Sequence, residues 1–200
     1  MFIREYFQLL FPWLLVTLVI VSVISWNNLS QFQKGWQKLA MLALSAVITL
    51  LPVHGLSLAD YLLSLNPNFS IGSLALVMVV LWPKLMGKSL LSDGQLFTFC
   101  LWNVVISLVL FSSYLGLLSY DLYALGYNFS LWFIFMALIT LITVWFFNPL
   151  SVIFIAYIMA FNLRLLPSPN FFDYITDGFL FLMSLGLLFP FLLPSRRLRQ

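Results

Sequence analysis

Charged side chains are scarce in this chain of 200 residues. Only 8% of the residues are charged, whereas soluble domains carry about 25%. Hydrophobic residues make up 63%, and the mean hydropathy is +1.07. Nine basic and six acidic side chains cannot cover the surface that a soluble domain of this length would expose to water. The composition therefore predicts an integral membrane protein.

Cysteine and histidine are almost absent, with Cys100 and His54 as the single examples. One cysteine excludes an intrachain disulfide and a thiolate metal cluster. One histidine excludes a bis-histidine haem and a histidine-rich zinc site within one chain. We expect no cofactor and no metal.

Sequence motifs of known enzyme classes are missing too. The chain has no phosphate-binding loop, no dinucleotide fingerprint, no zinc-protease motif and no nucleophile elbow. Its basic residues stand beside apolar runs, where they act as topology signals. Neither nucleotide nor nucleic acid is an expected partner; the expected partners are the lipid bilayer and other membrane protein subunits.

Long apolar runs dominate what is present. A membrane-spanning helix needs about 20 mainly apolar residues. Continuously apolar runs favour helices over the strands of a membrane barrel, which alternate apolar and polar residues. The first run is too long for a signal peptide. We predict an all-α protein with seven spans, at 7–26, 36–53, 70–86, 96–118, 130–147, 149–166 and 177–193. In the alternative, six helices span and 70–86 or 177–193 is re-entrant.

The distribution of lysine and arginine predicts the orientation. If the N-terminus is outside and the C-terminus is cytoplasmic, seven basic residues fall on the cytoplasmic side. They are Lys34, Lys38, Lys84, Lys88 and the arginines at 196, 197 and 199. Arg4 and Arg164 are then the basic residues outside. The connecting segments are too short to fold alone, so residues 1–200 are expected to form a single polytopic transmembrane domain.

A repeated phrase marks the outer ends of the expected hairpins. Residues 57–82 and 119–145 each contain an Asp and a Tyr within two positions, then Asn-Phe-Ser and an apolar stretch ending in Trp. A fainter third copy covers 165–174. This pseudo-repeat predicts a first span followed by three helical hairpins in the same orientation, as in parallel-repeat transporters.

Ionisable groups gather at the predicted outer face. Such a cluster could bind a cation, hold a lipid head group or perform acid–base chemistry. Alternatively, these residues cap helices at the membrane interface, as is also expected of Ser70 and Ser130. If one helix continued through Asp173 and Asp177, these residues would share a face and repel unless a cation or Arg164 lay between them. The candidate cluster comprises His54, Asp60, Asp121, Arg164, Asp173 and Asp177.

Two asparagines fall inside predicted spans. Asn103 lies several residues into the fourth span and Asn162 towards the outer end of the sixth. Amides in hydrocarbon seek partners on neighbouring helices, which predicts that both join helices together.

Three functions fit these features. The first is a non-catalytic subunit, assembly factor or accessory factor of a cell-envelope complex in a bacterial inner membrane. The second is a small transporter or channel that uses the outer-face aspartates. The third is an enzyme that acts on a lipid head group, with Asp173 or Asp177 as the base and Arg164 on the phosphate.

Overall fold

The structure, a computed structural model, describes residues 2–26 and 35–192. Its contacts divide the chain into two compact units. Unit 1 comprises Met1–Phe69, Leu74–Leu90 and Leu165–Pro167, and unit 2 comprises Ser70–Ser73, Leu91–Arg164 and Ser168–Gln200. Each unit is described by itself below.

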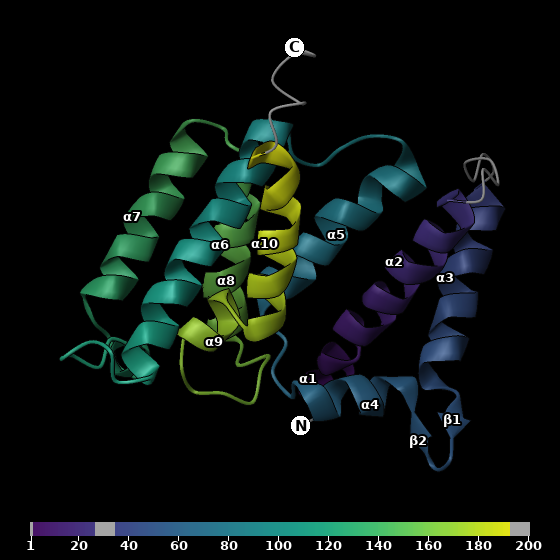
Figure 1. Cartoon of the computed structure of the whole chain (residues 1–200), viewed down its shortest axis with the longest axis horizontal. Helices are drawn as coiled ribbons and strands as arrows, with labels where there is room; N and C mark the ends of the chain where they lie inside the picture. The colour runs from purple at the N-terminus through teal and green to yellow at the C-terminus, as the bar shows by residue number, and fades with distance from the viewer. Residues whose placement is uncertain (1, 27–34, 193–200) are drawn as a thin grey trace. The chain divides into compact units, whose positions relative to one another are not determined.

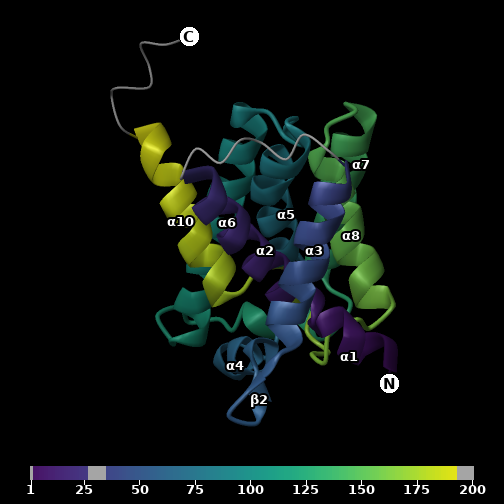
Figure 2. The same cartoon turned by 90° about the vertical axis from the view of Figure 1, so that its right-hand side faces the viewer.

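Unit 1 is built mainly from helices. In chain order its elements are α1 (Phe2–Gln8), α2 (Leu10–Trp26), α3 (Gly35–Leu50), β1 (Pro52–Val53), β2 (Leu56–Ser57), α4 (Leu58–Leu65) and most of α5 (Ile71–Met86). Helices α2 and α3 lie side by side (Figures 1 and 2).

Buried hydroxyl groups join α2 to α3. The hydroxyls of Thr17 and Ser45 are 2.7 Å apart, and both residues are wholly buried. The indole Nε1 of Trp13 donates to Ser45 Oγ at 3.1 Å and to the Leu42 carbonyl at 3.0 Å. In an apolar helix pair such bonds select one register, because every other register leaves a polar group unpaired.

A short hairpin follows α3. Strands β1 and β2 pair antiparallel, with Val53 opposite Leu56, and the turn between them holds His54 and Gly55. Both turn residues have positive φ, 54° and 87°. This is the backbone that two-residue hairpin loops require, and it is costly for histidine.

Unit 2 contains the longest helix. Its elements are α6 (Asp93–Tyr114), the 3-10 turn η1 (Tyr123–Gly126), α7 (Leu131–Trp145), α8 (Leu150–Asn162), α9 (Phe172–Ile175) and α10 (Gly178–Leu192). Helix α6 begins at a capping box in which Ser92 and Gln95 bond each other's backbone amides. The closest packing joins α6 with α10 and α7 with α8.

The apolar runs of the sequence correspond to helices. Each of the seven predicted ranges corresponds to an apolar helix, with ends that differ from the prediction by a few residues. Among the described residues, Arg4–Ile24 and Asp93–Tyr114 are long and apolar enough to cross a membrane, and five further apolar helices are shorter. The chain is thus helical and compatible with a helical membrane protein.

Helix pairing in unit 2 differs from the predicted hairpins. The sequence predicts hairpins of α6 with α7 and of α8 with α10, and its tight Asn148-Pro149 turn predicts that α7 and α8 are antiparallel neighbours. Among the described helices α7 does pack on α8, whereas α6 packs most closely on α10. Consecutive apolar helices need not be packing partners, because their surfaces are apolar all round and carry no stripe that selects a neighbour. The residues used for the orientation at 34, 196, 197 and 199 lie outside the described part of the chain.

Candidate functional site

Asp177 caps two helices at once. Its Oδ2 accepts from the Ser70 backbone amide and from the Ser73 hydroxyl, both at 2.6 Å. Its Oδ1 accepts from the Leu180 amide at 2.8 Å, in the first turn of α10. The start of α5 and the start of α10 therefore share one carboxylate. The partial positive charges of two helix N-termini thus face the same carboxylate and stabilise its ionised form.

The chain is interrupted just before Asp177. Helix α9 ends at Ile175, Thr176 is extended, and α10 begins at Gly178. The Thr176 hydroxyl lies 2.5 Å from the hydroxyl of Ser107 on α6, and both side chains are buried. Asp173 therefore lies on α9, whereas Asp177 lies just before α10, and the two carboxylates have different partners. The continuous helix that would have placed them on one face does not form.

Gly72 allows the start of α5 to approach the rest of unit 2. A Cβ at this position would overlap the Ile175 carbonyl oxygen and the Leu180 side chain, and would lie 3.1 Å from the Tyr157 hydroxyl. Only glycine has room for this contact. The close approach brings Ser70 and Ser73 within bonding distance of Asp177.

Asp173 bonds to an aromatic residue instead. The Tyr123 hydroxyl donates to Asp173 Oδ1 at 2.6 Å. Burial raises the pKa of the Tyr123 phenol well above its ordinary value, and the nearby Asp173 carboxylate raises this pKa further. Tyr123 thus remains a proton donor at neutral pH.

Asn170 holds η1 in place beside Asp173. Its Nδ2 donates to the Tyr123 carbonyl at 3.0 Å, and its Oδ1 accepts from the Phe172 amide at 2.9 Å. The Phe171 amide donates to the Gly126 carbonyl at 2.9 Å. Gly126 lies against Asn170 where a Cβ would clash. Asn170 is wholly buried, and these bonds give both polar atoms of its side-chain amide a partner.

The remaining acidic candidates cap short turns. Asp121 is exposed, and its Oδ1 accepts from the Ala124 amide at 3.2 Å. In unit 1, Asp60 and Ser57 form a capping box at the start of α4. Hydrogen bonds from the Ser57 hydroxyl and amide lower the pKa of Asp60. Both carboxylates therefore accept hydrogen bonds from backbone amides a few residues away in the sequence.

The basic candidates stand apart from these carboxylates. His54 and Arg164 are exposed, and neither forms an ion pair with a carboxylate among residues 2–26 and 35–192. Arg164 follows the end of α8 with φ of 50°, the left-handed conformation that commonly terminates a helix. Asn162, two residues earlier, is exposed and donates to the Ile158 carbonyl of its own helix at 2.9 Å. The hydrogen bond of Asn162 thus stays within its own helix, and the prediction that Asn162 joins two helices is not supported by the described residues.

Asn103 is the exception among the candidates because it is buried without a bond. Its side chain is 0% exposed, and within the described chain neither Oδ1 nor Nδ2 has a hydrogen-bond partner. The prediction that its amide bonds a neighbouring helix is not supported. The Tyr157 hydroxyl and the indole Nε1 atoms of Trp102 and Trp132 are also buried without partners in this part of the chain.

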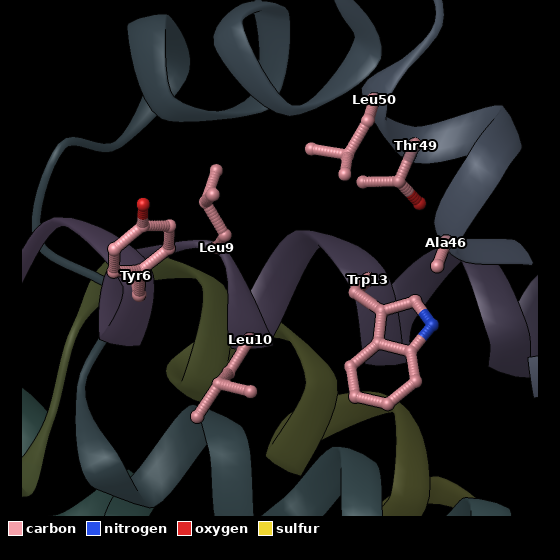
Figure 3. A pocket seen from close by; sticks show the side chains of 7 residues that line it. All are labelled: Tyr6, Leu9, Leu10, Trp13, Ala46, Thr49 and Leu50. Carbon is pink, nitrogen blue, oxygen red and sulfur yellow. The ribbon is translucent and has the colours of Figure 1, made fainter. Parts of the chain in front are cut away.

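Unit 1 contains an apolar groove of about 220 Å³ (Figure 3). The Thr49 hydroxyl in its wall donates to the Ser45 carbonyl at 2.7 Å. Tyr6 supplies the one titratable side chain among the lining residues. The other lining side chains are almost all apolar, so the groove suits an alkyl chain. The lining residues are Tyr6, Leu9, Leu10, Trp13, Ala46, Thr49 and Leu50.

Comparisons with known proteins identify no relative. No protein-family model matches the chain, and neither the curated proteins nor the solved structures include a significant match.

Sequence reasoning identified the acidic residues but missed most of their partners. Ser130 is confirmed as the N-cap of α7, where its hydroxyl accepts from the Trp132 amide. Ser70 also contributes to capping, since its hydroxyl accepts from the Ser73 amide at 3.0 Å. Ser73, Tyr123 and Tyr157 were not singled out. The Gly72-Ser73 pair just inside an apolar run could have indicated a close helix contact.

Proposed function

We propose that this chain is a seven-span membrane protein that serves as a non-catalytic subunit, assembly factor or accessory factor of a cell-envelope complex. The observation that carries the proposal is the use of its carboxylates. Asp60, Asp121 and Asp177 cap helices or turns, and Asp173 accepts a bond from Tyr123. Groups committed to local structure are poorly placed to exchange protons with a substrate.

The exposed apolar side chains support the membrane location. On α6, a helix long and apolar enough to cross a membrane, the side chains of Leu101, Val105 and Leu108 are exposed. In water, contiguous apolar surface of this kind drives association, whereas in lipid it is solvated. We place the protein in a bacterial inner membrane with the N-terminus outside and the C-terminus cytoplasmic.

The end of α7 supports a role in association. Trp145, Phe146 and Phe147 are 80%, 72% and 94% exposed. Aromatic residues at helix ends sit well in the membrane interface, and they are also enriched where proteins contact each other. Three consecutive exposed aromatic residues offer a partner subunit a large apolar contact at low entropic cost.

Native mass spectrometry tests the proposal. The tagged chain is expressed at its natural level, extracted with its surrounding lipid in polymer nanodiscs and weighed intact. We expect a complex that contains a second kind of polypeptide at fixed stoichiometry. A species with the mass of the tagged chain alone, which is 23.0 kDa plus the tag, or a multiple of that mass, would contradict the proposal. A variant with Trp145→Ala and Phe147→Ala should release the partner, whereas the lipid-facing control Leu101→Ala should retain it.

A transporter is the second candidate, favoured by the unpartnered amide of Asn103 and hydroxyl of Tyr157 inside unit 2. Buried polar groups inside membrane bundles often mark solute pathways. Uptake that falls in Asp121→Asn and Asp173→Asn variants would favour this candidate. The lipid-enzyme hypothesis gains no such support, because Arg164 is exposed and unpaired with Asp173 or Asp177 in the described chain.

A further inference from the structure

The apolar groove of unit 1 has two walls, each built from one face of a helical segment (Figure 3). The residues of each wall follow the spacing that places side chains on a single helix face. From Tyr6 to Trp13 the first wall extends about 10 Å along the helical segment. The first wall consists of Tyr6, Leu9, Leu10 and Trp13 from α1 and α2, and the second of Ala46, Thr49 and Leu50 from α3.

The polar atoms deep in these walls already have partners. Trp13 Nε1 donates to the Leu42 carbonyl at 3.0 Å and to the Ser45 hydroxyl at 3.1 Å. The Thr49 hydroxyl donates to the Ser45 carbonyl at 2.7 Å. A water molecule held inside a protein needs two to four polar partners. The lining residues do not offer such a set, so water is a poor occupant of the groove.

The volume of the groove decides between two apolar occupants. It measures about 220 Å³. One turn of an α-helix, about 10 Å wide and about 5.4 Å long, occupies roughly 400 Å³, so a partner helix is too large. An apolar cavity of about 150 Å³ is large enough for benzene and its six carbons. By proportion, this groove takes roughly nine carbons of an alkyl chain.

The groove is continuous with the exposed apolar surface of α3. Leu50 lines the groove and is itself exposed, as is Val47 one turn before it. In the proposed membrane location this surface faces lipid. An unfilled groove would leave its walls without van der Waals contacts, and a chain from the surrounding lipid restores them. Tyr6 is exposed at one end, where a phenol suits the polar membrane interface.

Contacts within unit 1 keep the two walls in place. Helix α4 contacts both α2 and α3. Gln8 Nε2, at the end of α1, donates to the carbonyl of Pro67 at 3.2 Å. The bonds of Trp13 to α3 fix the indole that ends the first wall. The groove therefore does not have to be shaped by its ligand, which lowers the entropic cost of binding.

We propose that this groove is a lipid-binding site that holds one linear fatty acyl chain of a membrane phospholipid, with the polar end of the chain at Tyr6. The proposal rests on the membrane location proposed above and not on the accessory role. No charged side chain belongs to the lining, so the chain rather than the head group is recognised. Phospholipids with the same chains and different head groups should therefore bind alike.

Native mass spectrometry of the purified chain tests this site. The protein is extracted from washed membranes in digitonin, a detergent whose rigid rings cannot follow a narrow groove. It is then titrated with dimyristoyl phosphatidylglycerol or with dimyristoyl phosphatidylcholine. We expect one tightly held phospholipid per chain, with affinities for the two lipids that agree within about threefold. Absence of a bound lipid, or affinities that differ by more than about tenfold, would overturn the proposal.

Variants that fill the groove locate the bound lipid. Ala46→Phe should weaken binding at least about tenfold, because the new ring takes the space of the acyl chain. Ala43→Phe, exposed on the same helix and outside the groove, is the matched control and should bind like the wild type. If Ala46→Phe does not fold, Leu50→Trp replaces it, since Leu50 is exposed and tolerates a larger side chain. Undiminished binding in the folded groove variant would place the lipid elsewhere and overturn the proposal.

The same preparation separates failure of this site from failure of the membrane location. A chain that leaves the membranes in an alkaline carbonate wash would refute the location, and the groove with it. A chain that stays in the membranes but carries no phospholipid would refute the groove alone. The accessory role is tested independently by the search for a second polypeptide.

Discussion

The backbone amide of Ser70 donates to the carboxylate of Asp177 at 2.6 Å, across 107 residues of sequence. The same carboxylate also caps α10 through the Leu180 amide. One acidic side chain thus fixes where two apolar helices begin. In a chain with so few charged groups, an anion between two helix N-termini contributes to both orientation and stability.

Gly72→Ala should destabilise the protein. The new Cβ would meet the Ile175 carbonyl oxygen, a backbone atom that cannot rotate away. We expect a loss of about 1–3 kcal/mol in the free energy of unfolding, measured by denaturation in lipid-like detergent. Gly186→Ala, inside α10 with open space at its Cβ, is the matched control and should stabilise by about 0.5–1 kcal/mol. Equal effects at the two glycines would contradict the close contact at Gly72.

Tyr123 should make stability sensitive to alkaline pH. Burial and the Asp173 carboxylate raise the pKa of this phenol in the folded protein above its unfolded value of 10.0. The folded state then holds the proton after the unfolded state has released it. The stability that Tyr123 contributes to the folded protein is fully present below pH 10 and is lost as the pH rises towards the folded pKa. Melting curves should show a steeper fall in Tm above about pH 10 for the wild type than for Tyr123→Phe. Parallel falls would show that Tyr123 does not contribute.

Acid should loosen α4 before α6. Hydrogen bonds from Ser57 lower the pKa of Asp60 below 3.8 in the folded protein. The capping box is therefore fully formed above the unfolded pKa and is lost as the pH falls through the lower, folded value. The box at the start of α6 uses Ser92 and the neutral Gln95, so it does not titrate. Hydrogen-exchange protection between about pH 5 and pH 2.5 should fall in α4 and persist in the first turn of α6. Equal loss in both helices would contradict a specific role for Asp60.

Ser45→Ala should weaken unit 1. The Ser45 hydroxyl contacts Thr17 and accepts from Trp13, so its loss removes one hydrogen bond from each of these groups on α2. Trp13 keeps its bond to the Leu42 carbonyl, and Thr17 keeps its bond to the Trp13 carbonyl. We expect a loss of about 1–2 kcal/mol by reversible unfolding in detergent. Thr143→Ala is the control, because that hydroxyl bonds only to carbonyls of its own helix. A loss no larger than the control's would mean that these bonds do not hold α2 to α3.

The positions of the helices could be predicted because the physics is local. A run of apolar residues must satisfy its own backbone in lipid, and that requirement locates a helix without knowledge of its neighbours. The capping role of Ser130 was predictable for the same reason, since a serine ahead of an apolar run serves the amides that follow it.

Apart from α7 and α8, which the tight Asn148-Pro149 turn makes neighbours, the partners of the helices were not predictable from the sequence. The packing of α6 on α10 depends on contacts such as Ser107 with Thr176, which are 69 residues apart. The role of Asp177 depends on Ser70 and Ser73, and nothing in the local sequence links them. Sequence spacing suggested a pairing with Asp173, but the chain breaks its helix at Thr176 and separates the two carboxylates.

A double-mutant cycle between Asp177 and Ser73 tests the architectural role of the carboxylates most directly. Unfolding free energies are measured in nanodiscs for Asp177→Ala, Ser73→Ala and the double variant, with the exposed Asp93→Asn as a control. We expect Asp177→Ala to cost about 2–4 kcal/mol, Asp93→Asn about 0.5 kcal/mol or less, and a coupling of about 1–2 kcal/mol between Asp177 and Ser73. Additive single effects, with Asp177→Ala no more costly than Asp93→Asn, would contradict the account.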